Sequence, residues 1–411
     1  MKFETIVTGA GLAGLTAAIR LAEAEQKVGL ISAGHSALHF CTGSFGLLGF
    51  DSAHKAVEHP IEALADLADA HPYKKIGGAS LEGLADEAVA LLNRAGVKTA
   101  GSARENHTRI SPLGVLRPAW LTLENMATLE ALKSLKRPHV VIAGIAGFLD
   151  FYPRFIAATL EKEGIKCDIV TVDNADLRNL RKSESEMRSA NIARVLRGEA
   201  LVHFAESVYD AVSTSEPEAV ILPAVVEAAP AVFEGIVGRK VLFAPTVGVS
   251  VPGIEIHSRL IHRFTEAGGR LLNGHRVTGA DFDGDRLTAV YTDRLDDDAL
   301  YADNFIFAAG SFFGRGLTAT PDEVIEPVFG LDTAAPAERD GWFTADLFGV
   351  QPVMNAGVAV DDSFRAMRSG VPVRNLYAAG ACIAGADSLH NDSGAGVAML
   401  TALAVADKII K

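Results

Sequence analysis

The sequence predicts an α/β fold in which a domain built on a parallel sheet is interrupted by a second α/β unit. Three observations carry this prediction: a glycine motif between the first strand and the first helix, short apolar strands that alternate with helices after His139, and two late strands that each stop at a glycine. We therefore expect residues 1–105 and 246–411 to form one domain and residues 106–245 to form an inserted cap.

The first element is an apolar strand that ends at Thr8, and a helix over residues 15–25 is expected soon after it. The motif between them is Gly9, Ala10, Gly11, Leu12, Ala13 and Gly14. In a Rossmann-like unit the first glycine permits a tight turn, the second lets the backbone approach a phosphate, and the third lets the helix pack on the strand. The N–H groups at the start of the helix then face the phosphate. These six residues are therefore predicted to bind a nucleotide-type cofactor.

The second strand, residues 27–31, leads into Ser32, Ala33 and Gly34, which are also predicted cofactor contacts. In the usual dinucleotide unit a carboxylate at this place holds the adenosine ribose, and here the residue is Ser32. A hydrogen bond to a charged group is worth about 1.5–3 kcal/mol, so its absence weakens adenosine binding. The sequence thus favours a mononucleotide, FMN, over FAD or NAD without excluding either.

The loop over residues 32–46 is predicted to lie at the carboxyl edge of the sheet, where open α/β sheets bind their ligands. Its small and hydroxyl-bearing residues allow a flat ring to approach the backbone. The residues predicted to contact the cofactor here are His39, Thr42, Gly43 and Ser44. His39 either donates to a flavin edge and moves a proton, or is a hydrogen-bonded loop histidine.

An extended run over residues 108–121 is punctuated by prolines and combines two arginines with a tryptophan. Arg117 is the candidate to anchor a phosphate or carboxylate through paired hydrogen bonds. A surface salt bridge is the alternative interpretation. His39 and Arg117 are therefore the two candidate catalytic residues.

The predicted cap alternates short apolar strands with helices, as expected for a parallel sheet. Its predicted strands are residues 140–143, 168–172, 219–222 and 240–243, and its predicted helices are residues 148–163, 183–197 and 228–237. A helix over residues 253–267 and a hairpin that turns at Asp283-Gly284-Asp285 then return the chain to the first domain.

Two late strands end in small residues, at Ala309 and Gly310 and again at Gly380. The last helix opens on Gly394, Ala395, Gly396 and Val397. Bare N–H groups at such a start would stabilise negative charge on the pyrimidine edge of a flavin, so all of these residues are predicted cofactor contacts. The alternative is an ordinary helix capped by Ser393.

The chain carries 38 basic and 51 acidic residues, a formal net charge of −13. A negative field repels nucleic acid and anionic lipid headgroups, so neither is an expected direct partner. The best apolar stretch, residues 219–233, is too short and too broken by prolines to span a bilayer, and we expect a cytoplasmic protein without a membrane span. The three cysteines form no Cys-x-x-Cys, which argues against an iron–sulfur cluster, and no metal site is expected.

Several longer segments match a known family. They are Ser36-Ala37-Leu38-His39-Phe40, Gly43-Ser44, His71-Pro72-Tyr73, Pro112-Leu113-Gly114-Val115-Leu116-Arg117, Asn191-Ile192-Ala193-Arg194, Gly310-Ser311-Phe312-Phe313 and Asn375-Leu376-Tyr377. On these segments the chain resembles, nearly end to end, the B subunits of anaerobic glycerol-3-phosphate dehydrogenase.

The resemblance implies a flavoprotein subunit with FMN that works with a larger, FAD-bearing catalytic subunit. It also implies that an iron–sulfur subunit of the same assembly anchors the chain to the cytoplasmic side of the inner membrane. The implied reaction is the oxidation of sn-glycerol 3-phosphate to dihydroxyacetone phosphate, with electrons passed to quinone in anaerobic respiration.

Two other functions stay open. One is a free-standing FAD-dependent oxidoreductase of the succinate dehydrogenase-like class. The other is a non-catalytic assembly or electron-relay subunit, which is favoured by Ser32 and by Ala381, where related flavoproteins place carboxylates.

Overall fold

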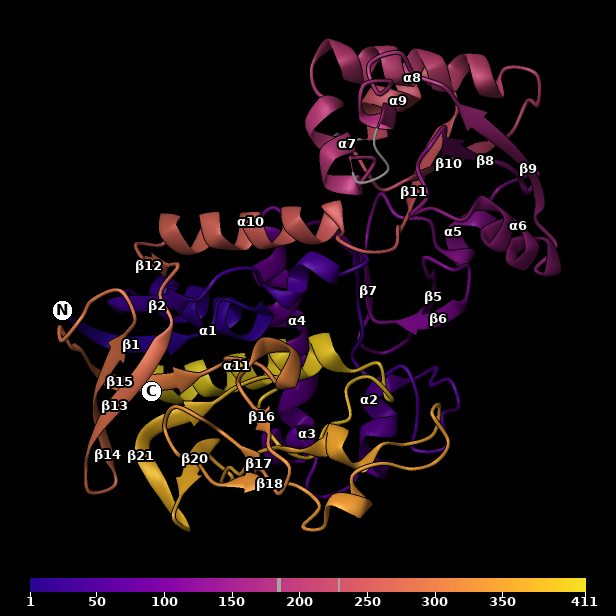
Figure 1. The fold of residues 1–411 in the computed structure, drawn as a ribbon. Helices are drawn as coiled ribbons and strands as arrows, with labels where there is room; N and C mark the ends of the chain where they lie inside the picture. Colours follow the sequence, from indigo (N-terminus) through magenta and orange to yellow (C-terminus); the bar gives the residue numbers. More distant parts are fainter. Residues whose placement is uncertain (183–185, 228–229) are drawn as a thin grey trace.

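The computed structural model describes residues 1–182, 186–227 and 230–411. Figure 1 shows two units of unequal size. The large unit contains an eight-stranded sheet, and the smaller unit, the cap, contains a four-stranded sheet. Helix α10 (Val251–Glu266) lies across the large unit, with its first residues toward the cap (Figure 1).

The large sheet has a parallel centre. Its strands are β1 (Lys2–Thr8), β2 (Val28–Ser32), β12 (Arg270–Asn273), β13 (Val277–Asp283), β14 (Arg286–Thr292), β15 (Leu300–Phe307), β20 (Arg365–Arg368) and β21 (Val371–Ala378). Strands β12, β2, β1, β15 and β21 pair in parallel in that order, whereas β13, β14 and β20 pair in antiparallel fashion. The carboxyl ends of the parallel strands meet at one edge, where ligands bind in open α/β sheets. The predicted hairpin turn at Gly284 joins β13 to β14.

Helices α1 (Leu12–Glu23), α4 (Gly78–Arg94) and α11 (Gly394–Ile410) pack together with α10 in the large unit (Figure 1). Helix α1 begins at Leu12, earlier than the predicted residue 15, because Gly11 already occupies its N-cap position. Helices α1 and α11 approach closely where Gly380 lies between them, since a Cβ there would contact Ala13 and Ala398.

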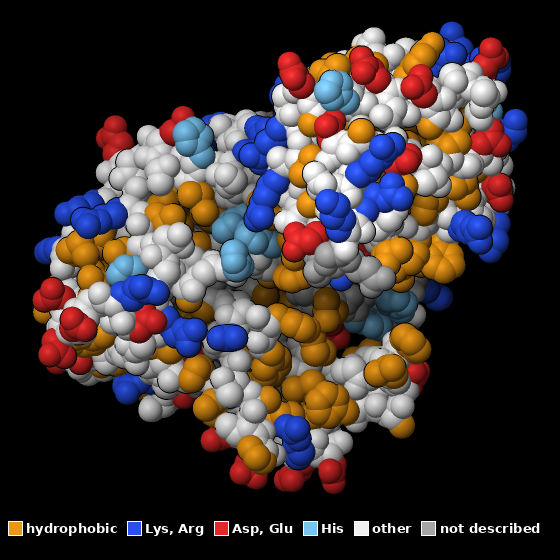
Figure 2. Space-filling view, turned by 45° about the horizontal axis from the view of Figure 1, so that its top comes forward, with side chains coloured by type: hydrophobic (Ala, Val, Ile, Leu, Met, Phe, Trp, Pro, Cys, Tyr) orange, Lys and Arg blue, Asp and Glu red, His pale blue; other side chains and the backbone are white. Residues whose placement is uncertain are grey.

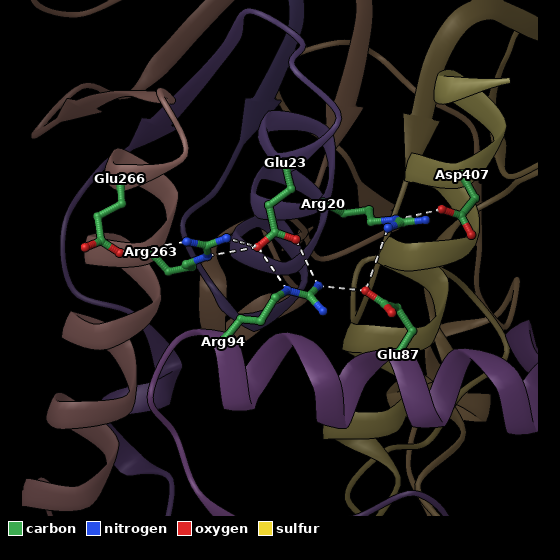
Figure 3. Close-up of polar contacts among 7 residues, drawn as sticks. All are labelled: Arg20, Glu23, Glu87, Arg94, Arg263, Glu266 and Asp407. Atoms are coloured by element: carbon green, nitrogen blue, oxygen red, sulfur yellow. Dashed lines mark hydrogen bonds and ion pairs between the residues drawn. The ribbon is translucent and has the colours of Figure 1, made fainter.

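An ion-pair network ties these helices together at the end of α1 remote from the glycine motif (Figure 3). Glu23 accepts hydrogen bonds from Arg94 of α4 at 2.9 Å and from Arg263 of α10 at 2.7 Å. Arg20 of α1 pairs with Asp407 of α11 at 2.9 Å. Burial opposes ionisation of Glu23, but the two arginines outweigh it and lower the pKa of this carboxyl. The network therefore fixes the four helices relative to one another.

The cap is a parallel α/β unit, as predicted. Its sheet has the order β11 (Lys240–Ala244), β10 (Ala219–Pro223), β8 (His139–Ile145) and β9 (Lys166–Val172). Its helices are α5 (Leu129–Lys133), α6 (Pro153–Lys162), α7 (Ser189–Val195), α8 (Glu199–Val212) and α9 (Pro230–Val237).

The predicted cap strands match to within two residues, but the helices match less well. The helix expected from residue 148 begins only at Pro153. The helices expected from residues 183 and 228 begin in segments, 183–185 and 228–229, that lie outside the described residues. Helix α8 was not predicted at all.

Several further elements are short. They are η1 (Ala37–Phe40), β3 (Ser44–Phe45), α2 (Pro60–Ala63), α3 (Pro72–Ile76), β4 (Thr99–Gly101), β5 (His107–Ile110), β6 (Leu116–Ala119), β7 (Leu121–Leu123), β16 (Thr318–Ala319), β17 (Val324–Ile325), β18 (Thr333–Ala334) and β19 (Gly357–Val358). Strands β5 and β6 form a hairpin, and β7 pairs with β3 and β4 of the large unit.

The buried apolar side chains form two clusters, one on each sheet. The large-unit cluster includes Ile6 and Leu400, and the cap cluster includes Ile142 and Phe204. The domain boundaries near residues 105 and 245 remain a prediction. Within the described ranges, no helix is long and apolar enough to cross a bilayer.

Candidate functional site

The glycine motif forms a tight turn between β1 and α1. Gly9 has a φ of +104°, and a Cβ there would fall on the carbonyl of Ala308. A Cβ at Gly14 would fall on the carbonyl of Gly9. By contrast, a Cβ at Gly11 would meet only Ser36 Oγ among the described residues, at an ordinary contact distance of 3.9 Å, so the backbone here is not closely packed. The motif therefore has the shape in which two glycines pack and one leaves room for a ligand.

The start of α1 is electrostatically suited to an anion. It has no side-chain cap and no acidic residue in its first turn. Its free N–H groups and the positive end of the helix dipole attract negative charge. The N–H groups of Leu12 and Ala13, in the first turn, would be the donors that hold a phosphate.

Three strand ends meet beside this turn. The chain leaves β1 at Gly9, β15 at Ala309 and Gly310, and β21 at Gly380. Gly310 and Gly380 have φ values of +79° and +82°, respectively, which favour glycine. The structure thus brings together predicted site residues that are separated by some 300 positions in the chain.

Ser32 is the last residue of β2, as the ribose position requires. Its hydroxyl donates to the carbonyl of Gly34 at 3.2 Å, and its own carbonyl accepts from the N–H of His275. Ala33 and Gly34 are exposed. None of these three residues supplies the carboxylate that usually binds a ribose.

The loop after β2 is held from both sides. His39 Nε2 lies 3.0 Å from Nδ1 of His257, which is on α10. Thr42 Oγ1 accepts from Arg109 at 3.4 Å. Gly43 packs against Met126 and Leu123, while Ser44 Oγ accepts from Thr122 of β7 at 2.9 Å. His39 and Thr42 therefore face other polar groups, whereas Gly43 and Ser44 are used to attach the loop to β7.

Arg117 belongs to a cluster that the sequence alone did not reveal. Arg109 on β5 lies directly opposite Arg117 on β6. Both donate to Asp392 Oδ2, Arg109 at 2.9 Å and Arg117 at 3.1 Å. The Arg117 guanidinium also stacks on Phe50, 4.8 Å from the ring centroid. The hairpin register is the only signal that pairs the arginines, and nothing local in the sequence points to Asp392.

The four predicted residues at the start of α11 have different surroundings. Gly394 and Ala395 are partly exposed. Gly396 donates to the carbonyl of Gly46 at 2.8 Å and packs against Tyr73, and Val397 is fully buried. Ser393 makes no capping hydrogen bond, contrary to the alternative interpretation.

Histidine side chains lie at the junction between the large unit and the cap (Figure 2). Burial lowers the pKa of both His39 and His257, with a smaller contribution from the neighbouring histidines. Within the described residues, no group of His, Cys, Asp or Glu is arranged to hold a metal ion.

A family model described as an FAD binding domain matches residues 4–397. A protein from Yersinia pseudotuberculosis, named as the B subunit of anaerobic glycerol-3-phosphate dehydrogenase, is 39% identical over all of this chain and 98% of its own length. Relatives of the same name from Pectobacterium atrosepticum and Actinobacillus succinogenes are 37% and 34% identical, each over all of this chain and 99% of the relative. The chain belongs to this FAD-binding family and, within it, to the group of these B subunits. The resemblance found in the sequence and the predicted fold class are thus confirmed.

Among solved structures, the chain is similar to 3-ketosteroid Δ1-dehydrogenase from Sterolibacterium denitrificans. The two share 12% identity with a TM-score of 0.45, over 100% of this chain and 99% of the other.

The family model points to FAD and gives no support to the expected FMN. The expectation rested on the family resemblance and on the missing carboxylate at Ser32. One lost hydrogen bond to a charged group is worth only about 1.5–3 kcal/mol, which is a small part of the binding energy of a large cofactor.

Proposed function

We propose that this chain is a flavoprotein subunit of anaerobic glycerol-3-phosphate dehydrogenase. It holds FAD at the start of α1, beside the carboxyl ends of the parallel strands. It takes part in the oxidation of sn-glycerol 3-phosphate to dihydroxyacetone phosphate, with electrons passed through partner subunits to quinone. The full-length similarity to B subunits supports the assembly and the substrate.

The observation that supports a phosphate-bearing substrate is the cluster of Arg109, Arg117 and Asp392. Two guanidinium groups share one carboxylate, so the cluster keeps an excess positive charge. Arg109 and Arg117 side chains are only 15% and 28% exposed, which strengthens their attraction for an anion. Planar guanidinium groups bind phosphate through paired hydrogen bonds. The cluster is therefore the proposed site of the substrate phosphate.

His39 is the proposed proton acceptor. Oxidation at C2 of the substrate removes a hydride from carbon and a proton from the hydroxyl group. The flavin, when bound, supplies the acceptor for the hydride. The lowered pKa of His39 keeps its ring neutral near pH 7, so that it can take up the hydroxyl proton. His39 and Thr42 lie on the same short loop, and Thr42 contacts Arg109. One loop therefore carries the proposed proton acceptor and contacts the proposed phosphate site.

The proposed partners are an FAD-bearing catalytic subunit and an iron–sulfur subunit at the cytoplasmic side of the membrane. A segment near residue 345 offers them an apolar surface: Phe343, Leu347, Phe348 and Val350 are 57%, 80%, 92% and 42% exposed. Large contiguous patches of exposed apolar side chains mark interaction sites, and these four residues lie close together in the chain. The same segment carries Glu338, Asp340 and Asp346, which favours a protein partner over an anionic lipid surface.

A co-purification experiment tests this surface. The double variant Leu347→Ser, Phe348→Ser is expected to lose its partner subunits on size exclusion while keeping its own flavin. A retained complex would exclude the segment as the interface.

The phosphate site is tested with the purified holo complex. Arg109→Gln and Arg117→Gln should each raise KM for glycerol 3-phosphate about 10- to 100-fold, because a charged hydrogen bond is lost. Flavin content should stay the same. Arg154→Gln, on the exposed face of α6, is the matched control. An unchanged KM in both site variants would show that the substrate phosphate does not bind at this cluster.

The cofactor is tested by the mass of the flavin released on denaturation. FAD supports the proposal. FMN would show that the missing carboxylate at Ser32 prevents binding of the adenosine part of FAD. No flavin after reconstitution would favour a non-catalytic assembly subunit. Turnover by the isolated chain would favour the free-standing oxidoreductase.

A further inference from the structure

Three histidine rings lie in series beside the glycine motif. The centroids of His35 and His39 are 5.2 Å apart, and those of His39 and His257 are 5.0 Å apart. His39 Nε2 lies 3.0 Å from His257 Nδ1. On its far side, His257 Nε2 lies 3.1 Å from the carbonyl oxygen of Ala10, within the motif. The series thus ends on the backbone that forms the predicted phosphate site.

The contact with the Ala10 carbonyl determines which ring nitrogens of His257 and His39 carry a hydrogen. A carbonyl oxygen only accepts, so His257 Nε2 must carry the hydrogen in its bond to Ala10. A neutral His257 then has a lone pair at Nδ1, which accepts from the Nε2–H of His39. The remaining ring nitrogen of a neutral His39, Nδ1, is left with a lone pair. Burial keeps both rings neutral near pH 7, since it lowers the pKa of each.

The backbone around the two rings is held in place from both elements. Ser250, the N-cap of α10, donates its N–H to the carbonyl of His39 at 2.7 Å, and its hydroxyl accepts from Gly253 at 3.1 Å. The missing side chain of Gly253 lets the carbonyl of Leu38 approach α10. His257 lies one helical turn after Gly253, on the same face. The loop and the helix are therefore docked by contacts that do not depend on the imidazole pair.

We infer that His257 is a positioning residue that holds His39 as its Nε2–H tautomer, so that Nδ1 of His39 is the atom that accepts a proton. The use of that proton in turnover rests on the proposed function. The tautomer itself does not, because it follows from the contact with Ala10. His35, at the outer end of the series, is the other ionisable group that acts on the pair in the described part of the chain.

Two substitutions of His257 each keep one of its two hydrogen bonds and remove the other. In His257→Asn, the side-chain oxygen takes the place of Nδ1 and still accepts from His39, while the bond to Ala10 is lost. In His257→Gln, the amide reaches the place of Nε2 and still donates to Ala10, but no acceptor faces His39. A purely structural role makes no distinction between these ends.

The first measurement is the 15N chemical shifts of the histidine rings in the full-length holoprotein at pH 8, with His39→Gln used to assign the His39 signals. We expect the Nε2–H tautomer of His39 in the wild type and in His257→Asn, and its loss in His257→Gln. An Nδ1–H tautomer in the wild type, or an unchanged His39 spectrum in His257→Gln, would overturn the inference.

The second measurement is the pH profile of kcat and KM in the complex with its partners. His257→Gln should lower kcat about ten- to a hundred-fold with little change in KM, and should shift the acid limb of the profile. His262→Gln, on the exposed side of the same helix, should leave the profile unchanged. If the tautomer behaves as expected but His39→Gln keeps full turnover, the proposed catalytic role of His39 fails while the positioning role stands.

Discussion

A single buried histidine should make the large unit sensitive to mild acid. His71 is 3% exposed and is the N-cap of α3, where its Nδ1 accepts from the N–H of Tyr73 at 3.2 Å. Its Nε2 is buried and has no hydrogen-bond partner among the residues that the structure describes. Burial, assisted by Lys74, lowers the pKa of His71 from 6.5 to about 4. Protonation of Nδ1 would also replace an acceptor by a donor and break the cap.

The direction of the effect follows from proton linkage. Because the folded-state pKa is depressed, the unfolded chain binds more protons between pH 6.5 and pH 4. The stability that His71 contributes is therefore complete above pH 6.5 and is lost as the pH falls toward 4. With the two pKa values, the loss between pH 7.5 and pH 5 is about 2 kcal/mol.

The variant His71→Asn tests this value, because asparagine is a good N-cap that does not titrate. Urea unfolding at pH 7.5 and pH 5 is followed by tryptophan fluorescence, since both Trp120 and Trp342 belong to the core of the large unit. The variant should lose about 2 kcal/mol less stability between the two pH values than the wild type. The exposed His262→Asn change should behave like the wild type. Equal losses in His71→Asn and the wild type would refute the reasoning.

Three further outcomes are expected. Gly11→Ala should lower flavin affinity at least about ten-fold without lowering the melting temperature of the apoprotein, since the methyl group enters the space proposed for the ligand and meets no protein atom closer than 3.9 Å. Equal flavin content in Gly11→Ala and in the helix control Gly83→Ala would contradict this. Glu23→Gln should cost about 1–3 kcal/mol of unfolding free energy, because Arg94 and Arg263 each lose a half-buried charged partner. The exposed Glu266→Gln should cost little. Asn375→Ala should cost about 2 kcal/mol or more of unfolding free energy, because the buried amide bridges β21 to β14 and β15. The exposed Asn273→Ala is the control, and an equal cost in the two variants would argue against the bridge.

The local features of the site were predictable from the sequence. Gly9 and Gly11 sit in a motif whose spacing encodes both the turn and the helix start, so six residues are sufficient to identify it. The ends of β15 and β21 were predictable for the same reason, because each strand stops at a glycine that adopts a positive φ. Such features depend on a residue and its immediate neighbours.

The partners of the candidate catalytic residues were not predictable, because they come from distant segments. His257 is 218 positions from His39, and Asp392 is 275 positions from Arg117. Neither partner lies in a motif, and each looks like an ordinary helix or loop residue in the sequence. A distant partner also appears at the final helix, where the amide of Gly396 is bonded to the carbonyl of Gly46, a contact that the glycine-rich start does not reveal.

These long-range contacts explain why the loop from His39 to Ser44 is central to the site. Its first residue is fixed by α10, its middle is contacted by Arg109 of the β5–β6 hairpin, and its last residue pairs with β7. Asp392 ties the same hairpin to the start of α11. A shift of the hairpin relative to the large unit would therefore disturb the loop and the arginine cluster together. The proposed proton acceptor and the proposed phosphate site are thus linked through one loop, although the residues that form them are scattered over most of the chain.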